Sequence, residues 1–157
     1  MSSDDPLIFT PLASPITDKD SVRALIPQKD PMCMLDQLLR ADTEITRTRL
    51  DIREDNLFFE DRNLSESGVI ENMAQTIAIR VGYYYNSVNN TAPKGFIGAI
   101  RNMKLTRLPK LGESIECEIK VEQEIFGVTM VSGKTFIGDE MIASGTIKTV
   151  LEKTESD

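Results

Sequence analysis

Glu71 and Gln75 stand four residues apart in a stretch with helical patterning. Residues at this spacing share one face of an α-helix, so the carboxylate and the amide are expected side by side. A carboxylate held in this way can act as a general acid, a general base or a nucleophile. The blander alternative is a glutamate that only complements the dipole near the start of the helix.

Histidine is absent from all 157 residues. It is the side chain best matched to moving protons at neutral pH, so this chain alone cannot complete chemistry that needs a histidine as acid and base. The two cysteines, Cys33 and Cys117, lie far apart and are expected to be reduced thiols. A metal site would need carboxylates alone, and we expect neither a metal nor an organic cofactor.

Apolar residues recur with a helical period between Ser67 and Asn86, which predicts one long helix with Ser67 as its N-cap. Gly68 and Val69 fall in the first turn, where backbone N–H groups have no partner within the helix and the dipole favours negative charge. We therefore expect these two N–H groups to bind a carbonyl oxygen whose negative charge grows during a reaction.

Shorter elements are expected around this helix. A helical turn is predicted over residues 21–26, followed by two strands that meet near residues 41–43, although periodicity also permits a helix over 32–40. Past Gly95 the patterns are those of four strands, over residues 96–105, 114–125, 127–137 and 140–151. This order predicts an α+β fold in which a curved antiparallel sheet wraps one long central helix.

The length fits one compact domain, which we place at residues 21–157 behind an irregular N-terminal arm, residues 1–20. The 18 Lys and Arg residues against 25 Asp and Glu give a net charge of −7, which argues against nucleic acid as a partner. Lys104, Arg107 and Lys110 cluster in the sequence, either as a docking patch for an acidic protein or as a solvated face. No apolar run is long enough for a membrane span, and with reduced cysteines we expect a cytoplasmic protein.

Four segments, at residues 25–36, 71–75, 95–101 and 111–113, resemble in their order and position those of the hotdog-fold 3-hydroxyacyl-carrier-protein dehydratases. Residues 25–36 resemble that family's Leu-Pro-His-x-x-Pro-Met segment with the Leu-Asp pair that follows it, and residues 71–75 resemble its Glu-x-Met-Ala-Gln helix motif. Residues 95–101 and 111–113 resemble the start of its third strand and its Gly-Asp/Glu turn. The sequence is most similar to the dehydratase-like subfamily associated with aryl-polyene biosynthesis, in which the helix motif occurs with a Gly-Phe-Leu-x-Gly-x-Arg strand.

The sequence departs from this family at its histidines. Gln28 replaces the histidine of the Leu-Pro-His segment, and residues 56–67 form a shorter loop that lacks the histidine of the family's Gly-His-Phe-Pro loop. In the family, that second histidine works with the helix glutamate of the other protomer to remove an α-proton and expel a β-hydroxyl. The resemblance implies a catalytic role for Glu71 and substrate contacts at five further residues: Gly68, Val69, Gln75, Gln28 and Arg101. The alternatives are that Gln28 fills a polar loop and that Arg101 forms a surface or subunit ion pair.

The resemblance implies a dehydratase-like protein of fatty-acid or polyene synthesis that acts on or binds 3-hydroxyacyl thioesters of acyl carrier protein or coenzyme A. It also implies a homodimer or a heterodimer with a related hotdog subunit, whose histidine could complete a site between the subunits. We expect dehydration by the chain alone to be impaired. The alternatives are an acyl-thioesterase that uses Glu71 and a non-catalytic subunit of a heteromeric dehydratase.

Overall fold

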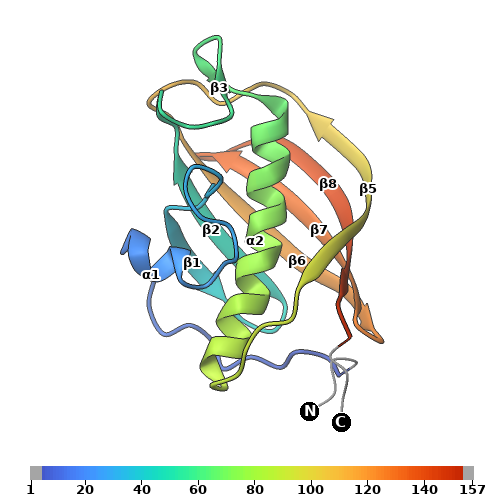
Figure 1. Cartoon of the computed structure of the whole chain (residues 1–157). Helices are drawn as coiled ribbons and strands as arrows, with labels where there is room; N and C mark the ends of the chain where they lie inside the picture. Colours follow the sequence, from blue (N-terminus) through green and yellow to red (C-terminus); the bar gives the residue numbers. More distant parts are fainter. Residues whose placement is uncertain (1–4, 154–157) are drawn as a thin grey trace.

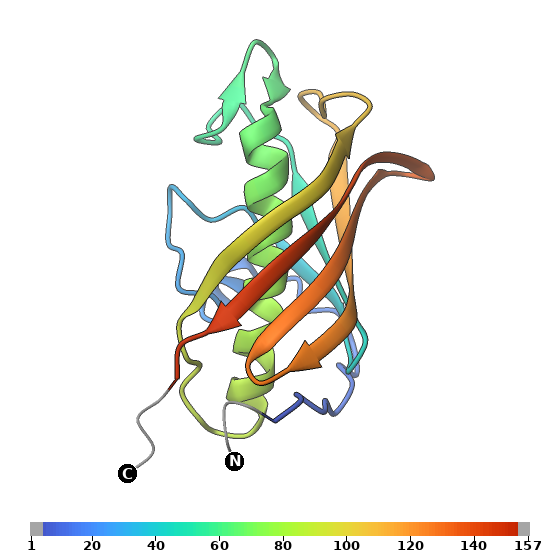
Figure 2. The same cartoon turned by 90° about the vertical axis from the view of Figure 1, so that its right-hand side faces the viewer.

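The computed structural model describes residues 5–153 (Figure 1). Its elements follow in the order α1 (Lys19–Arg23), β1 (Gln37–Ala41), β2 (Ile45–Asp51), β3 (Phe59–Glu60), β4 (Asn63–Leu64), α2 (Glu66–Ser87), β5 (Gly95–Leu105), β6 (Ser114–Ile125), β7 (Val128–Ile137) and β8 (Glu140–Leu151). Six strands form one antiparallel sheet in the order β1-β2-β6-β7-β8-β5, and β3 and β4 form a separate hairpin. The sheet curves around α2, which lies against its concave face (Figure 2). This is the α+β arrangement expected from the sequence.

The long elements begin and end close to the predicted positions. The strands β6 and β8 have the predicted bounds, and the turn between β7 and β8 uses Gly138 at φ 58°, a left-handed conformation that glycine adopts without strain. The alternative helix over residues 32–40 is wrong, because residues 37–41 pair as β1 with β2. The predicted turn over 21–26 begins earlier, at Lys19, because Asp18 caps it by accepting from the Ser21 N–H.

The start of α2 differs from the prediction by two residues. Its N-cap is Ser65 rather than Ser67, because Ser65 has extended backbone and its hydroxyl accepts from the Gly68 N–H at 3.2 Å. Ser67 already lies inside the first turn. A Cβ on Gly68 would lie within 3 Å of the side chains of Leu64 and Phe58, so this turn packs closely on the chain that leads into it.

One flank of α2 packs on the sheet. Met73 and Ile77 pack against apolar residues of β6, β7 and β8. All four of these strand residues are fully buried: Cys117, Ile119, Val131 and Ile147. Gly133 of β7 permits this contact, since a Cβ there would overlap the Met73 sulfur. Burial of these apolar side chains anchors the helix against the strands.

A second flank of α2 is covered by α1 and the loop that follows it. Val22, Ile26, Leu35 and Leu38 form a buried cluster with Ile79 of α2. Gly82 lies so close to the carbonyl group of Leu25 that a side chain at position 82 would overlap the Leu25 oxygen. The loop after α1 is therefore held against α2 at Leu25, Ile26 and Leu35.

The N-terminal arm lacks helices and strands over residues 5–18, apart from one bridge between Ile16 and Leu38, and its first four residues lie outside the described part. Its side chains are nonetheless part of the core. Leu7 and Phe9 are buried against Tyr84 and Tyr85 at the end of α2. The arm thus closes the C-terminal end of the helix.

Within residues 5–153, no helix is long and apolar enough to cross a membrane.

Candidate functional site

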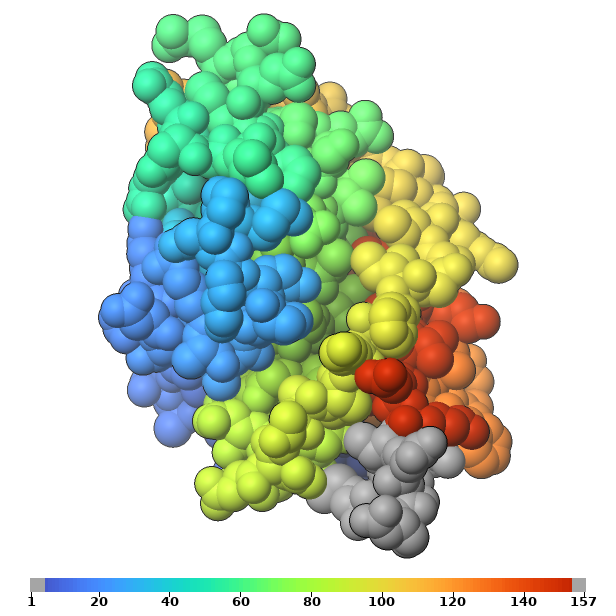
Figure 3. Space-filling model, in the orientation of Figure 1, coloured from blue at the N-terminus to red at the C-terminus, as the bar shows by residue number. Residues whose placement is uncertain are grey.

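The third flank of α2 faces a pocket of about 630 Å³ between the helix and the start of β5. Figure 3 shows the helix surface open to view between the chain before β1 and β5. The walls are mainly apolar: residues 24–28 lie on one side, residues 91–97 with Thr149 and Leu151 on the other, and α2 contributes Glu71, Ala74, Ile77, Ala78, Val81 and Gly82. Small side chains at positions 74, 78 and 82, each one turn apart, leave a hollow along the helix of roughly 12 Å, since the rise is ~1.5 Å per residue.

Glu71 and Gln75 meet as the sequence predicts. The Gln75 amide nitrogen donates to the Glu71 carboxylate at 2.9 Å and also to the Met32 carbonyl at 2.7 Å. The Gln75 carbonyl oxygen accepts from the Met34 N–H at 2.7 Å. Gln75 is fully buried, whereas Glu71 is half-buried and lines the pocket. The polar atoms of Gln75 are therefore all used in hydrogen bonds to Glu71 and to the loop before β1.

Gln28 lies in the wall of the same pocket. Its side-chain oxygen is buried and has no hydrogen-bond partner among residues 5–153. An unpaired buried polar atom costs about 1–3 kcal/mol, so it is the kind of group that a bound ligand or water would satisfy. Gln28 and Glu71 thus present one amide and one carboxylate to a hollow whose lining is mainly apolar.

Gly68 and Val69 are placed at the start of α2, as predicted, but their N–H groups are not free. The Gly68 N–H donates to the Ser65 hydroxyl, and the Val69 N–H donates to the Ser65 carbonyl at 3.1 Å. The expectation of two unshielded N–H groups at these positions is corrected by this cap. Carbonyl binding there stays a prediction, and it would require Ser65 to release the Gly68 N–H.

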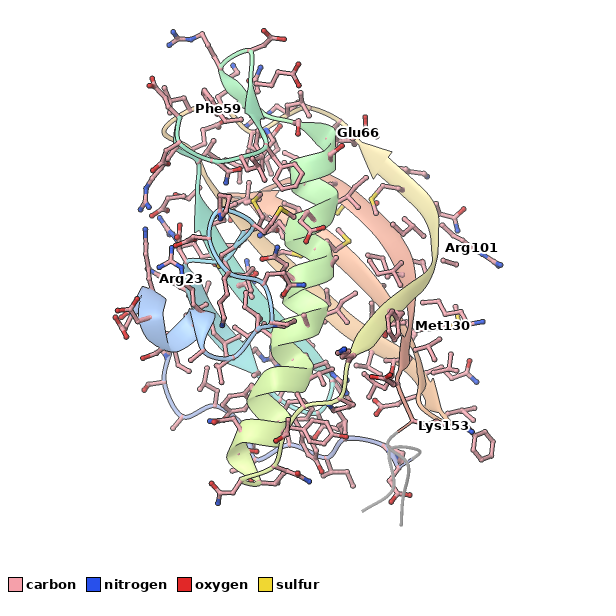
Figure 4. All side chains as sticks on the ribbon, viewed as in Figure 1. Arg23, Phe59, Glu66, Arg101, Met130 and Lys153 are labelled. Atoms are coloured by element: carbon pink, nitrogen blue, oxygen red, sulfur yellow. The ribbon has the colours of Figure 1, made fainter. Side chains whose placement is uncertain are left out.

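Arg101 lies apart from the other predicted site residues. It is exposed on β5, and Figure 4 shows its side chain pointing away from α2. The strand places it opposite Thr146 of β8, on the face of the sheet that the helix does not cover. The structure therefore does not bring Arg101 to Glu71 within this chain.

Asn72 was not selected from the sequence, although it stands inside the Glu-x-Met-Ala-Gln motif. It is fully buried and its amide nitrogen donates to the Met34 carbonyl at 2.8 Å. Its oxygen has no partner within the described residues. Asn72 and Gln75 together hold the backbone of residues 32–34 against α2, so the motif fixes a loop as well as a carboxylate.

The loop that replaces the family's Gly-His-Phe-Pro segment is a short hairpin. Its two turn residues, Asp61 and Arg62, have φ values of 50° and 65°, and its strands are β3 and β4. A turn with two positive φ values fits a two-residue hairpin. The tip carries Asp61 and Arg62, so nothing in it moves protons as a histidine would.

The basic cluster predicted around Arg107 is largely neutralised. The Arg107 guanidinium contacts the carboxylate of Glu113 at 2.9 Å and that of Glu140 at 2.9 Å. The hydrogen bond from Arg107 lowers the pKa of Glu113 to about 2. Of the docking patch considered from the sequence, Lys104 and Lys110 remain as exposed cations.

The thiol of Cys117 is not activated for chemistry. Both cysteines are free, and Cys117 is fully buried, which raises the pKa of its thiol to about 11. A thiol of that kind is protonated at neutral pH and is a poor nucleophile. Among residues 5–153, no three metal-binding side chains of the His, Cys, Asp and Glu types are grouped closely enough to hold an ion.

A comparison with models of protein families identifies the family of this chain. The model of the ApeP-like family, described as ApeP dehydratase, matches residues 20–156. The chain belongs to this family. The match confirms the expected relationship to hotdog-fold, dehydratase-like proteins linked to aryl-polyene biosynthesis. A search of curated proteins gives no match.

Solved structures share the fold of this ApeP-like chain. The dehydratase heterocomplex ApeI:P from Xenorhabdus doucetiae matches with a TM-score of 0.79 and 16% identity, over 85% of this chain and 91% of that one. Thioesterase superfamily member 2 of zebra fish matches with a TM-score of 0.66 and 15% identity, over 85% and 95%. A hypothetical thioesterase of Streptococcus pneumoniae TIGR4, solved with coenzyme A, matches with a TM-score of 0.61 and 7% identity, over 76% and 87%. These likenesses confirm the hotdog fold.

Proposed function

We propose that this ApeP-like chain is one subunit of a heteromeric 3-hydroxyacyl-thioester dehydratase and does not dehydrate its substrate alone. The observation that carries the proposal is that Glu71 and Gln28 both line one mainly apolar pocket, in a chain without histidine. The pocket suits an acyl chain, and the carboxylate suits acid–base chemistry. A second subunit would have to supply the remaining proton carrier.

Dehydration requires two proton movements. A base removes a proton from the α-carbon, and an acid protonates the β-hydroxyl, which leaves as water while the α–β double bond forms. A charged carboxylate can remove the α-proton, but it holds a proton only after that step, so a separate acid is needed if the hydroxyl is protonated at the same time. Glu71 is therefore assigned one of the two roles, and a histidine of the partner subunit the other.

The free edge of β5 is where such a partner would join. In the described structure β5 stands at the end of the sheet and pairs with β8 on one side. Three large apolar side chains of β5 are exposed: Phe96, Ile97 and Ile100. An edge strand with exposed apolar residues is a template for strand pairing. Gly95, Phe96 and Ile97 also line the pocket, so a partner on this edge would lie beside Glu71.

Support for a heteromer rather than a homodimer comes from chemistry. Two copies of this chain would bring two glutamates and no histidine to their shared sites. The similar solved complex is described as a dehydratase heterocomplex, so pairing of unlike hotdog subunits has a precedent in this fold. The partner expected here is a related hotdog subunit that carries a histidine.

The test compares the purified chain, a histidine-bearing hotdog subunit of the same organism, and the two expressed together. Each is incubated with a 3-hydroxyacyl thioester, and the formation of enoyl thioester is followed. We expect no turnover by this chain, and turnover by the pair that exceeds that of the partner alone. Dehydration by this chain alone would overturn the proposal. Hydrolysis of acyl thioesters by this chain, lost in Glu71→Gln, would replace it with thioesterase activity.

A further inference from the structure

The six-stranded sheet has two edge strands, β1 and β5, which lie at opposite sides of the sheet (Figure 1). A strand at an edge presents backbone N–H and carbonyl groups that can pair with a strand of another chain. On β5 these groups face no further strand within residues 5–153. On β1 they face the N-terminal arm, residues 5–18, so the two edges differ in what they offer a partner.

The arm makes backbone hydrogen bonds along the outer side of β1. The Ile16 N–H donates to the Leu38 carbonyl at 2.8 Å, and the Leu38 N–H donates to the Ile16 carbonyl at 2.9 Å. The Leu12 N–H donates to the Ala41 carbonyl at 2.8 Å. Because β1 is a strand of five residues, Gln37–Ala41, these three bonds cover it from its second residue to its last.

Apolar side chains hold the arm in this position. Leu12 and Ile16 are half-buried and pack against the cluster that contains Leu38 of β1. Farther toward the N-terminus, Leu7 and Phe9 are buried at the C-terminal end of α2. Burial of these four side chains favours the bound arm over a detached one.

A buried ion pair secures the start of the arm. The Glu124 carboxylate accepts from the Leu7 N–H at 2.9 Å and from the Arg80 guanidinium at 2.9 Å. The Arg80 side chain is only 3% exposed, and its guanidinium lies 5.1 Å from the centre of the Phe9 ring. Since breaking a buried pair of this kind costs about 3–5 kcal/mol, the arm is part of the fold rather than a loose extension.

The arm is also unsuited to continue the sheet. Pro6, Pro11 and Pro15 have no backbone N–H to donate to a further strand. Between its bonds to β1 the chain bends at residues 13 and 14. Proteins protect edge strands from unwanted pairing with covering segments and prolines of this kind. The sheet therefore ends at β1, whereas it can be extended at β5.

We infer that the N-terminal arm is an edge cap, which blocks strand pairing at β1 and directs a second hotdog subunit to β5. Pairing between two subunits that each have one open edge stops at two, whereas a subunit with two open edges can pair on both sides and add further copies. The matched family model begins at residue 20, so the arm lies outside the matched part. The inference goes beyond the proposed function, because it concerns assembly and not the reaction.

The test compares the wild type with three variants of the full chain. Ile16→Pro removes the N–H that bonds to the Leu38 carbonyl and puts a ring in its place. Ile16→Ala removes the apolar contact but keeps both backbone hydrogen bonds. Ser14→Pro adds a proline at an exposed position of the arm, where the N–H makes no backbone hydrogen bond within residues 5–153.

Amide hydrogen exchange measures whether the arm covers β1. In the wild type, the amides of Leu12, Ile16 and Leu38 should be protected. In Ile16→Pro we expect the Leu38 amide to exchange about tenfold faster or more, and in the two controls at nearly the wild-type rate. Exchange of the wild-type Ile16 and Leu38 amides as fast as in an unstructured peptide would overturn the inference without any variant.

Sedimentation velocity at rising protein concentration measures the assembly of the chain alone. We expect Ile16→Pro to form a growing share of species larger than two copies, while the wild type and both controls stay at two copies or fewer. An unchanged size in Ile16→Pro, with fast exchange at Leu38, would overturn the inference. Equal growth of Ile16→Ala would also overturn it, because the backbone cap of that variant is intact. Neither readout uses thioester turnover, so an absence of dehydration would overturn only the proposed function.

Discussion

The Gln75 side-chain amide donates to the Glu71 carboxylate at 2.9 Å, one helical turn away. It also donates to the Met32 carbonyl and accepts from the Met34 N–H. The glutamine is fully buried. It therefore fixes the orientation of the carboxylate and ties it to the loop that bears Gln28. Gln75 is a positioning residue in this account, although the sequence suggested that it contacts substrate.

Replacing Gln75 with alanine should destabilise the protein and the site together. Gln75→Ala leaves the Met34 N–H and the Met32 carbonyl without their partner, and we expect a loss of about 3 kcal/mol in the free energy of unfolding. Urea denaturation measures it. The control Gln123→Ala removes an exposed glutamine and should change stability by less than about 0.5 kcal/mol. Equal stability of the two variants would show that the buried amide is not needed to hold the loop.

Filling the hollow along α2 should restrict the acyl chain. Ala78 lines the middle of the pocket, so Ala78→Phe is expected to reduce turnover of long-chain thioesters by the assembled enzyme about tenfold relative to short-chain ones. The matched control, Ala13→Phe, places the same ring at an exposed position of the arm. An equal fall in turnover for all chain lengths would show that the acyl chain does not bind in this pocket.

Gly82 and Gly98 should differ in their response to the same added methyl group. In a helix, glycine to alanine ordinarily gains about 1 kcal/mol, but a Cβ at position 82 would overlap the Leu25 carbonyl oxygen. We expect Gly82→Ala to lower the melting temperature and to cost about 3 kcal/mol or more, since backbone must move. Gly98→Ala on β5 meets no atom closer than 3.6 Å and should be close to neutral. A stabilised Gly82→Ala would mean that the loop before β1 is not held against α2.

Stability should depend on pH through Arg107. Its hydrogen bond lowers the pKa of Glu113 from 4.5 to about 2 in the folded protein. A lowered folded pKa contributes stability above the unfolded value, and that contribution is lost as the pH falls from 4.5 toward 2. Arg107→Gln should therefore be less stable than the wild type at pH 6, with a difference that shrinks toward pH 2. Chemical denaturation at several pH values tests this, and a difference that grows on acidification would contradict it.

The long elements could be predicted because their patterns are regular over many residues. The helical period of α2 and the alternation along β6 and β8 are set by which side chains face one core, and a sequence displays them directly. The helix cap was missed because Ser65 and Ser67 are both suitable residues. The choice between them is made by the extended backbone at Ser65, which depends on packing of the preceding hairpin.

The site was predicted in part, and mainly through the resemblance. The contact between Glu71 and Gln75 follows from helix geometry, but the presence of Gln28 in the same pocket depends on the fold of a distant loop. The neutralisation of Arg107 could not be predicted from local sequence, because its partner Glu140 lies 33 positions away.

The most direct test of the central claim, that Glu71 is this chain's catalytic contribution to a shared site, is the dehydration rate of the assembled heteromer with Glu71→Gln in this chain only. The carboxylate is replaced by a group of nearly the same shape that cannot transfer a proton, so we predict a fall in kcat of about 100-fold or more. The control Glu66→Gln changes an exposed glutamate at the start of the same helix and should leave kcat unaltered. An unaltered kcat in Glu71→Gln, in a complex that still assembles, would contradict the account.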